Sequence, residues 1–207
     1  DNEGNITNSC YGITASCDVL LTSTDNVYYC QYHSGDTHYL VLKRPVGERT
    51  VCLVVDSTAL YQQLAADIRV GTNGYIVVKN DENRIIMHPE SAQWGIDILP
   101  GRQKLHASKD LDMGSLSDML KTQLEQDSGI LDYYSYWWTD PDLPRVRKLS
   151  AFRHLTLGDT FWSVSAVVDY DDLYRPVQES FFKLAALFGA IGVVLVLCTV
   201  LVFRLQQ

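Results

Sequence analysis

The most pronounced pattern along the chain is an apolar stretch close to its C-terminus. Residues 184–203 include no charged side chain, and Lys183 and Arg204 flank them. A helix rises about 1.5 Å per residue, so this stretch spans roughly 30 Å, the thickness of the hydrocarbon core of a bilayer. Buried helices of soluble domains are usually shorter and carry charges. The pattern therefore predicts a transmembrane helix at 184–203, followed by a short stub at 204–207.

The first quarter of the chain has the short apolar runs that are typical of β-strands. Residues 1–17 are polar and rich in turn formers, and four runs follow them, at 18–24, 27–33, 38–43 and 50–55. Asp, Asn, Ser, Gly and Pro separate the runs, as expected for turns. We therefore expect an antiparallel meander. The last run, TVCLVV, is continuously apolar, which predicts that it is the most buried strand.

A helical pattern follows at residues 57–70. Asp56 precedes it and can accept a hydrogen bond from a backbone N–H of the first turn. Three aliphatic residues recur every four positions and form one apolar stripe: Leu60, Leu64 and Ile68. Gly71 stands where a helix end favours a left-handed residue. We interpret residues 57–71 as a helix that connects two units.

Residues 72–169 have the pattern of a second compact unit. The segment GYIVVKNDENRIIMHP predicts a hairpin with its turn at 80–83. A polar segment with a break at Pro100 and Gly101 leads to a predicted helix at 115–125. The expected apolar face of that helix comprises Leu116, Met119, Leu120 and Leu124. Three more strands are expected, at 130–138, 146–155 and 161–168. In the last of them the apolar side chains that share one face are Trp162, Val164, Ala166 and Val168.

These elements predict an α+β protein. Its main part is an antiparallel five-stranded sheet with flanking helices, which a partial second β-rich unit precedes and one transmembrane helix follows. The expected segments are a partial first unit, a connecting helix, a complete second unit, a juxtamembrane helix, the transmembrane helix and a cytoplasmic stub, with bounds 1–56, 57–71, 72–169, 170–183, 184–203 and 204–207.

Charge and motif content exclude several classes of function. The net charge is −8, and Lys and Arg form no basic stripe, so we expect no nucleic-acid partner. The sequence holds no nucleophile elbow, Walker loop or dinucleotide fingerprint, so we expect no enzyme, no catalytic residue and no cofactor. The five histidines lack the spacing of metal ligands, and we expect no metal site.

Four of the five cysteines cluster in the first quarter of the chain: Cys10, Cys17, Cys30 and Cys52. Such a cluster ahead of a membrane span fits two disulfides in an oxidising compartment, and it equally fits ordinary buried thiols. The sequence leaves the pairing open. It contains no C-x-x-C motif, which argues against a zinc ribbon or a thioredoxin-type site.

The aromatic run at residues 133–138 is the most unusual composition in the chain. On a strand, alternate side chains share a face, so one set would be Tyr134, Tyr136 and Trp138, and the other Tyr133 and Trp137. Rings with polar tips suit a small-ligand pocket, which makes the first set candidate ligand contacts. Sheet packing and dimer contacts use the same residue types, so these alternatives stay open.

Two arginines and one histidine are further candidates. Arg147 and Arg153 lie on the next strand and could clamp a carboxylate ligand, or they could be solvated strand charges. For His88, which precedes Pro89, we expect a structural hydrogen bond rather than a catalytic role.

Taken in order, these segments resemble the extracellular PAS-like sensor module called Cache. The resemblance is carried by VCLVVDSTALYQQLAADIRVGTNGYIVVKNDENRIIMHP and by FWSVSAVVDYDDLYRPVQ, which stands directly before the predicted span. It extends well over residues 50–180 and loosely over 18–50. A strand ending in Asp, a helix, a hairpin ending in His-Pro and a late Trp-containing strand are similar to the double-Cache form.

The resemblance implies a function and a topology. The chain would be an N-terminally truncated double-Cache region that ends after the second transmembrane helix of a bacterial receptor. It would sense a small ligand outside the cytoplasm and signal through the membrane as a homodimer, in a histidine kinase, diguanylate cyclase or chemoreceptor. Double-Cache receptors usually take their ligand in the distal unit, but residues 1–55 lack the family's amino-acid-binding pattern.

Three alternatives remain open at this point. The chain could be a membrane-anchored adhesion or assembly domain without enzymatic activity, an ectoenzyme, or a cytosolic domain with a tail anchor. Because the sequence begins at Asp1 rather than at Met, we expect it to be a fragment or a processed chain.

Overall fold

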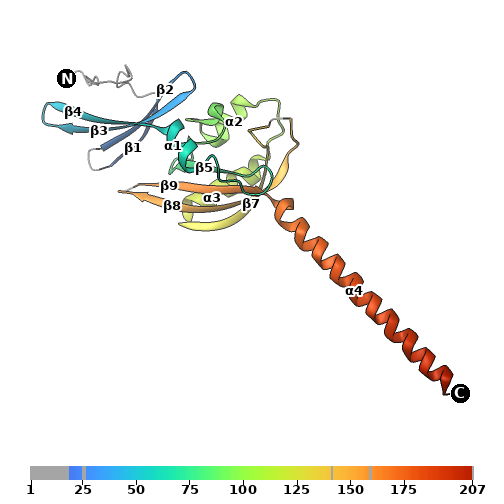
Figure 1. Ribbon diagram of the computed structural model, residues 1–207. Helices are drawn as coiled ribbons and strands as arrows, with labels where there is room; N and C mark the ends of the chain where they lie inside the picture. Colours follow the sequence, from blue (N-terminus) through green and yellow to red (C-terminus); the bar gives the residue numbers. More distant parts are fainter. Residues whose placement is uncertain (1–18, 25–26, 141, 159, 207) are drawn as a thin grey trace. The chain divides into compact units, whose positions relative to one another are not determined.

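The computed structural model describes residues 19–24, 27–140, 142–158 and 160–206 (Figure 1). The chain divides into two compact units, Asp1–Asp169 and Tyr170–Gln207. The first unit contains two antiparallel sheets and several short helices, and the second is a single helix. This arrangement confirms the predicted α+β class.

The first sheet is the predicted meander. Its four strands follow one another in space as they do in the chain: β1 (Val19–Thr24), β2 (Val27–Ser34), β3 (Thr37–Val46) and β4 (Arg49–Asp56). All neighbouring pairs are antiparallel. Gly35 and Gly47 hold positive φ angles of 59° and 62° in the two later turns, a conformation that costs glycine little.

The prediction that TVCLVV is the most buried strand is wrong. This run forms most of β4, which lies at the edge of the sheet, and Val51 and Leu53 are each 59% exposed. The buried residues of the sheet lie on the inner strands: Cys30, Gln31, Leu40 and Val41. A continuous apolar run indicates burial only when other elements cover both faces of the strand, and one face of β4 is uncovered by the described residues.

The connecting helix is shorter than predicted. Helix α1 spans Ser57–Leu64, and the side chain of Asp56 accepts a hydrogen bond from the Ala59 N–H at 2.8 Å, as expected for the N-cap. The predicted stripe is wrong, because Leu64 and Ile68 are exposed. Tyr61 faces the core instead, and its hydroxyl donates to the Ile76 carbonyl at 3.0 Å.

Removing the N-cap of α1 should destabilise the first unit measurably. Replacing Asp56 with Ala leaves the Ala59 N–H without its side-chain acceptor, so we expect the free energy of unfolding to fall by about 1 kcal/mol. Denaturant unfolding followed by tryptophan fluorescence measures this change. Asp67→Ala, an exposed aspartate just beyond the helix, is the control. An equal effect of both substitutions would remove the capping role.

The second sheet is the predicted five-stranded antiparallel sheet. Its strands are β5 (Tyr75–Asn80), β6 (Ile85–Met87), β7 (Ser128–Ser135), β8 (Val146–Leu157) and β9 (Thr160–Asp169). Their spatial order is β6-β5-β9-β8-β7. The hairpin of β5 and β6 and the long pair of β8 and β9 form as the sequence predicts.

Three helical segments lie between β6 and β7, and the sequence predicted only the last of them. These are η1 (Ser91–Gln93), α2 (Ile98–Leu105) and α3 (Met113–Glu125). We expected a break at Pro100 and Gly101, but Pro100 occupies the first turn of α2. Backbone N–H groups of the first turn have no partner within the helix, so proline costs no hydrogen bond there.

The second sheet is covered on both faces. One buried cluster joins it to α2 and α3: Tyr75, Val77, Ile85, Ile98, Leu116, Met119, Leu120, Tyr133, Trp137 and Val167. The other joins its opposite face to α1 and β3: Leu40, Tyr61, Val78, Ile86, Met87, Trp94 and Trp162. On β9, Trp162 and Val164 face the second cluster as predicted. Ser163 and Ser165 are also buried, because helices cover their face.

The second unit is one continuous helix, α4 (Tyr170–Leu205). The predicted juxtamembrane and transmembrane segments are parts of it, and Pro176 lies within it. Asp171 and Asp172 lie in the first turn, where carboxylates favour the positive end of the helix dipole. Within the described residues, α4 is the one helix that is long and apolar enough to cross a membrane.

Candidate ligand-binding site

Three of the five residues proposed as ligand contacts lie on one exposed face. Tyr134 and Arg147 are register partners on β7 and β8, and Tyr134 is 43% exposed. The Arg147 Nε is 2.8 Å from an Asp132 carboxylate oxygen, so this arginine forms a surface ion pair. Arg153 is exposed on the same face of β8. Tyr134 and Arg147 are neighbours, whereas Arg153 lies six residues further along β8, so the candidates do not form one site.

Tyr136 and Trp138 lie beyond the end of β7. The sequence predicted a strand through residue 138, whereas β7 ends at Ser135, so the alternation of faces stops there. Trp137 and Trp138 are both buried as a result. The Trp138 ring stacks on His106 with 4.3 Å between centroids, and the Arg102 guanidinium carbon lies 4.9 Å from its centroid. Trp138 therefore packs beside α2.

A pocket lies between the second sheet and the helices α2 and α3. It is lined by Tyr75, Val77, Lys79, Ile98, Arg102, Met119, Gln123, Tyr133, Ser150, Ser165 and Val167. The lining atoms enclose about 320 Å³ of empty space, part of it open to solvent. The part of this space in which the centre of a water molecule fits measures about 20 Å³. One water molecule needs roughly 10–15 Å³ by this measure, so the unliganded pocket has room for about one water molecule.

Three cationic side chains are buried at this pocket. Lys79 is 2% exposed, Arg102 is 5% exposed and Lys148 is 0% exposed. Lys79 and Arg102 line the pocket directly, and no acidic residue is among its lining residues. The carboxylate that acts on the cluster is Asp169, the register partner of Lys148. Lys79 and Arg102 therefore lack an acidic partner among the described residues.

Neutral groups accept the hydrogen bonds of these three basic side chains. The Lys79 ammonium donates to Gln123 Oε1 and lies 4.0 Å from the Met119 sulfur. The Arg102 Nε donates to Gln93 Oε1 at 3.1 Å. Lys148 donates to the Tyr136 carbonyl, and its Nζ lies 3.7 Å from the centroid of the Trp137 ring. Neutral acceptors and ring faces orient these groups without cancelling their charge.

Burial changes the protonation of the pocket. Loss of solvation, with a smaller contribution from Arg102, lowers the pKa of Lys79 to about 7. The same causes hold the pKa of Lys148 well below its usual value. Burial raises the pKa of Tyr133 to about 12, so this hydroxyl remains a donor. A buried charge is costly until it is paired, and an anion in the pocket would supply the missing partner.

Two polar networks fix the elements around the pocket. The Gln123 side-chain amide donates to Ser150 Oγ at 3.2 Å and lies 3.4 Å from Ser165 Oγ, which ties α3 to β8 and β9. These bonds orient the Gln123 oxygen towards Lys79. The inner face of the sheet is thus polar near its centre, although apolar residues surround it.

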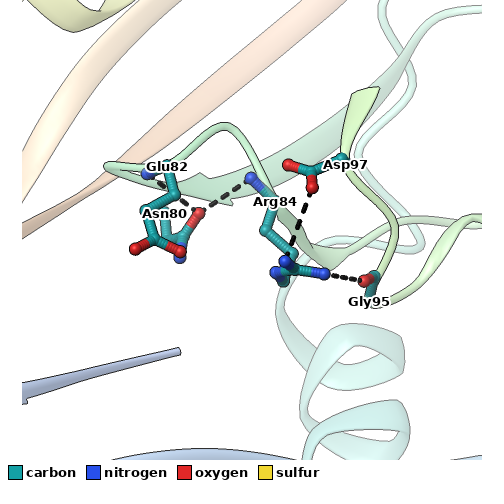
Figure 2. Close-up of polar contacts among 5 residues, drawn as sticks. All are labelled: Asn80, Glu82, Arg84, Gly95 and Asp97. Carbon is teal, nitrogen blue, oxygen red and sulfur yellow. Dashed lines mark hydrogen bonds and ion pairs between the residues drawn. The ribbon is translucent and has the colours of Figure 1, made fainter. Parts of the chain in front are cut away.

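The second network positions the start of α2 (Figure 2). Asn80 Oδ1 accepts hydrogen bonds from the N–H groups of Glu82 and Arg84, at 3.2 and 2.8 Å, and so closes the hairpin turn. The Arg84 guanidinium then donates to the Gly95 carbonyl at 2.8 Å and lies 3.5 Å from Asp97. Asp97 is the residue that precedes α2, so this clamp sets where the helix that carries Arg102 begins.

Sequence reasoning missed the charged centre of the pocket, although a signal was present. Lys79 interrupts the apolar run YIVVKN, and Gln123 lies on the same helix face as Leu116 and Leu120. A polar side chain at a core position is informative, because burying it requires a partner. Arg102 carried no such signal, because α2 itself was not predicted.

His88 has the structural role expected for it. It is buried, and its Nδ1 accepts a hydrogen bond from the Glu90 N–H at 2.9 Å. Its carbonyl accepts a hydrogen bond from the indole N–H of Trp94 at 2.6 Å. Burial, followed by the nearby Arg102 and Lys148, holds the pKa of His88 well below its usual value.

The cysteines form fewer disulfides than the two considered from the sequence. Cys30 is disulfide-bonded, whereas Cys52 is a free thiol. Two disulfides among the four clustered cysteines are therefore not formed. Cys10 and Cys17 lie outside the described residues.

Comparison with known proteins identifies the fold. No protein-family model matches the sequence. No curated protein matches it either. Among solved structures, the chain is similar to the periplasmic sensory domain of the Campylobacter jejuni chemoreceptor Tlp1, with a TM-score of 0.54 and 13% identity. The match covers 77% of this chain and 55% of that domain, so the chain spans about half of the domain's length.

Two weaker matches are of the same kind. The ligand-binding domain of the Pseudomonas fluorescens chemoreceptor CtaA, in complex with L-serine, has a TM-score of 0.44 and 13% identity over 72% of this chain and 57% of its own. The ligand-binding domain of the Pseudomonas aeruginosa PAO1 amino acid chemoreceptor PctB, in complex with L-Arg, has a TM-score of 0.44 and 16% identity. This match covers 79% of this chain and 60% of that domain. The first match carries the comparison: this chain shares the fold of that periplasmic sensory domain, in agreement with the architecture that its sequence predicts.

Proposed function

We propose that this chain is the extracytoplasmic ligand-sensing region of a transmembrane signal-transduction receptor, and that the pocket beneath α2 and α3 binds a small anion. The buried pair of Lys79 and Arg102, which lacks an acidic partner, is the observation that carries this proposal. An anion would compensate both charges, and the free energy gained would favour the liganded state. The receptor would be of the histidine kinase, diguanylate cyclase or chemoreceptor type, with no catalytic activity in this region.

Two features support a location outside the cytoplasm. Cys30 is disulfide-bonded, and disulfides persist mainly in oxidising compartments. α4 has the length and composition of a membrane span. In this proposal residues 1–56 are part of a membrane-distal unit, residues 57–71 connect it to the proximal unit at 72–169, residues 170–183 form the juxtamembrane part of α4, and residues 184–203 cross the membrane into a cytoplasmic stub at 204–207.

The covalent path from the pocket to the membrane is short. Ser165 and Val167 of β9 line the pocket, β9 ends at Asp169, and α4 begins at Tyr170. A ligand that favours one of two arrangements of β9 would pass a small shift along residues 167–178 into the span. In a homodimer, the shift would displace α4 of one copy relative to α4 of the other copy.

Transmission through a continuous helix predicts a dependence on helical phase. Inserting two residues between Tyr174 and Ser180 turns the following part of α4 by about 200°, since a helix has 3.6 residues per turn. In a chimera with a cytoplasmic kinase, we expect this insertion to abolish ligand-dependent output. A seven-residue insertion restores the phase to within about 20° and should retain output. Unchanged output with two added residues would contradict rigid transmission.

A stability screen of the full chain in detergent tests the sensory proposal itself. Small anions that bind the pocket should raise the melting temperature, and at equal concentration a tighter ligand should raise it further. The alternative, a membrane-anchored adhesion or assembly domain, predicts that no small metabolite shifts it. Lys79→Met should abolish the shift, whereas Lys121→Met, on the exposed side of α3 with a 72% exposed side chain, should retain it.

A further inference from the structure

A histidine on β8 connects the C-terminal end of α3 to the second sheet. The backbone N–H of His154 donates to the Asp127 carbonyl at 2.7 Å, just beyond the helix. Its Nε2 lies 2.6 Å from the carbonyl oxygen of Gln123, in the last turn of α3. The last carbonyls of a helix have no partner within the helix, and the ring supplies one. Because a carbonyl only accepts, Nε2 carries a proton in the neutral ring as well as in the charged one.

The second ring nitrogen makes this connection depend on charge. Nδ1 of His154 lies 3.6 Å from a carboxylate oxygen of Asp127. In the neutral ring Nδ1 bears a lone pair, since the proton is on Nε2, and two acceptors then face each other. Uptake of a proton from water turns Nδ1 into a donor towards the carboxylate. The contact is therefore attractive only when His154 is protonated.

Other contacts of the ring also accommodate a positive charge. The C-terminal end of a helix carries partial negative charge, which favours a cation at the Gln123 carbonyl. The His154 ring stacks on Phe161 of β9, with 3.7 Å between centroids and 17° between planes, and an aromatic face attracts a cation. The His154 side chain is 8% exposed, whereas that of Asp127 lies fully in solvent. The charged ring is thus held by three segments: α3, the connection after it and β9.

The charged groups around the ring are Asp127 on the connection after α3, Lys79 on β5 and Arg153 on β8 itself. Arg153 precedes the histidine, so it points to the opposite face of the strand. Lys79 and the histidine are both register partners of Ser163 on β9, which places them in one row, two strands apart. From α3 the ring faces Gln123, which does not titrate. Asp127 is therefore the charged group that contacts the ring.

These contacts lie next to the strand that leads into α4. Phe161, on which the ring stacks, is near the start of β9, and β9 ends at Asp169 directly before α4. The Gln123 side chain also contacts Ser165 of β9, with 3.4 Å between its Nε2 and Ser165 Oγ. A change in how the end of α3 is held therefore acts on β9.

From this geometry we propose that the receptor has a second input: His154 is a proton sensor, and its protonated ring latches the end of α3 to β8 through the Gln123 carbonyl and Asp127. The latch is closed at acidic pH outside the membrane and opens as the pH rises through the range in which histidine loses its proton, about pH 5 to 8. Opening changes the arrangement of β9 and of α4. This proposal rests on the proposed sensory function, but it requires neither the pocket nor its anion.

Hydrogen exchange of the full chain in lipid nanodiscs tests the latch without any ligand. After correction for the intrinsic exchange rate, protection of the backbone N–H groups of Gln126 and His154 should fall by about fivefold or more between pH 5.5 and pH 7.5. Asp127→Asn changes a fully exposed side chain and should reduce this fall to less than about twofold. Asp118→Asn, an exposed aspartate on α3, is the matched control and should keep the full fall. The same fall in Asp127→Asn as in the unchanged chain would overturn the latch.

Two further measurements separate the latch from the pocket. Lys79→Met should keep the pH-dependent protection, because Lys79 lies two strands from the ring; its loss would assign the response to the pocket and overturn the proposal. In the chimera with a cytoplasmic kinase and no added anion, output should change between pH 5.5 and pH 7.5 in the unchanged chain and in Asp118→Asn, but not in Asp127→Asn. Constant output, with anion-dependent melting shifts intact, would refute proton sensing and leave the sensory function standing. Loss of both responses would refute both.

Discussion

The Lys79→Met variant is expected to be more stable than the unchanged chain at pH 7, although it loses the proposed ligand. Its ammonium is buried against Gln123 and Met119 and lacks an acidic partner among the described residues. Methionine has a similar length and no charge to desolvate, so the substitution removes the cost and keeps most of the packing. A site that is costly in the free protein is typical of a binding function, because the ligand recovers the cost.

The lowered pKa of Lys79 determines how the free energy of unfolding changes with pH. The pKa of Lys79 is about 7 in the folded chain and about 10.4 in an unfolded one. Below pH 7 both states carry the proton, and the folded state bears the full cost of the buried charge. Between pH 7 and about 10 the unfolded state binds more protons, so the free energy of unfolding rises with pH. The rise attributable to Lys79 is roughly 4 to 5 kcal/mol over that window.

Unfolding in denaturant at a series of pH values measures this contribution as a difference between variants. The four tryptophans all lie in the first unit, so their fluorescence reports on it. We expect Lys79→Met to be the more stable chain at pH 7 and the difference to shrink towards pH 10. Lys121→Met should follow the unchanged chain at every pH. A Lys79→Met chain that is less stable at pH 7 would mean that the ammonium is already paired.

The second large effect concerns binding: the affinity of the pocket for a small anion, with propionate as the probe, should fall as the pH rises above 7. A carboxylate between Lys79 and Arg102 favours the ammonium form, so binding draws a proton onto Lys79 when the free amine is neutral. Above pH 7 the affinity should weaken by about tenfold per pH unit. Below pH 7 it should level off until the ligand itself takes up a proton. The other titratable groups around Lys79 are Arg102, Lys148, Tyr75 and Tyr133.

Calorimetric binding titrations in buffers of different ionisation enthalpy measure directly how many protons the chain takes up when the anion binds. We expect an uptake of about half a proton at pH 7, rising towards one at pH 8. Lys79→Arg supplies the control, because a guanidinium stays protonated over this range, so its affinity should not depend on pH. An affinity of the unchanged chain that is constant between pH 6.5 and 8.5 would contradict the role given to Lys79.

The strands were the most predictable part of this fold. Alternating and apolar runs between turn residues located β5, β6, β8 and β9 closely, because local sequence determines both the turns and the period of two. Burial was less predictable. The run TVCLVV has the composition of a core strand, but it lies at a sheet edge, and the position of a strand within a sheet depends on contacts distant in sequence.

The site was predictable only in its chemistry. The sequence indicated aromatic rings and an arginine clamp for a carboxylate, and the structure places three of these candidates, Tyr134, Arg147 and Arg153, on an exposed face. The structure instead buries Lys79 and Arg102 under helices that follow the hairpin. The sequence around a lysine next to a turn is the same whether solvent or a helix covers its side chain. Only the tertiary packing of α2 and α3 separates the two cases.

A structure of the chain determined at pH 6.5 with a small anion, propionate as the probe, tests the central claim most directly. The account predicts oxygen atoms of the anion within about 3 Å of Lys79 Nζ and of the Arg102 guanidinium. Propionate bound at any other place, while Lys79 keeps only Gln123 as its partner, would contradict it.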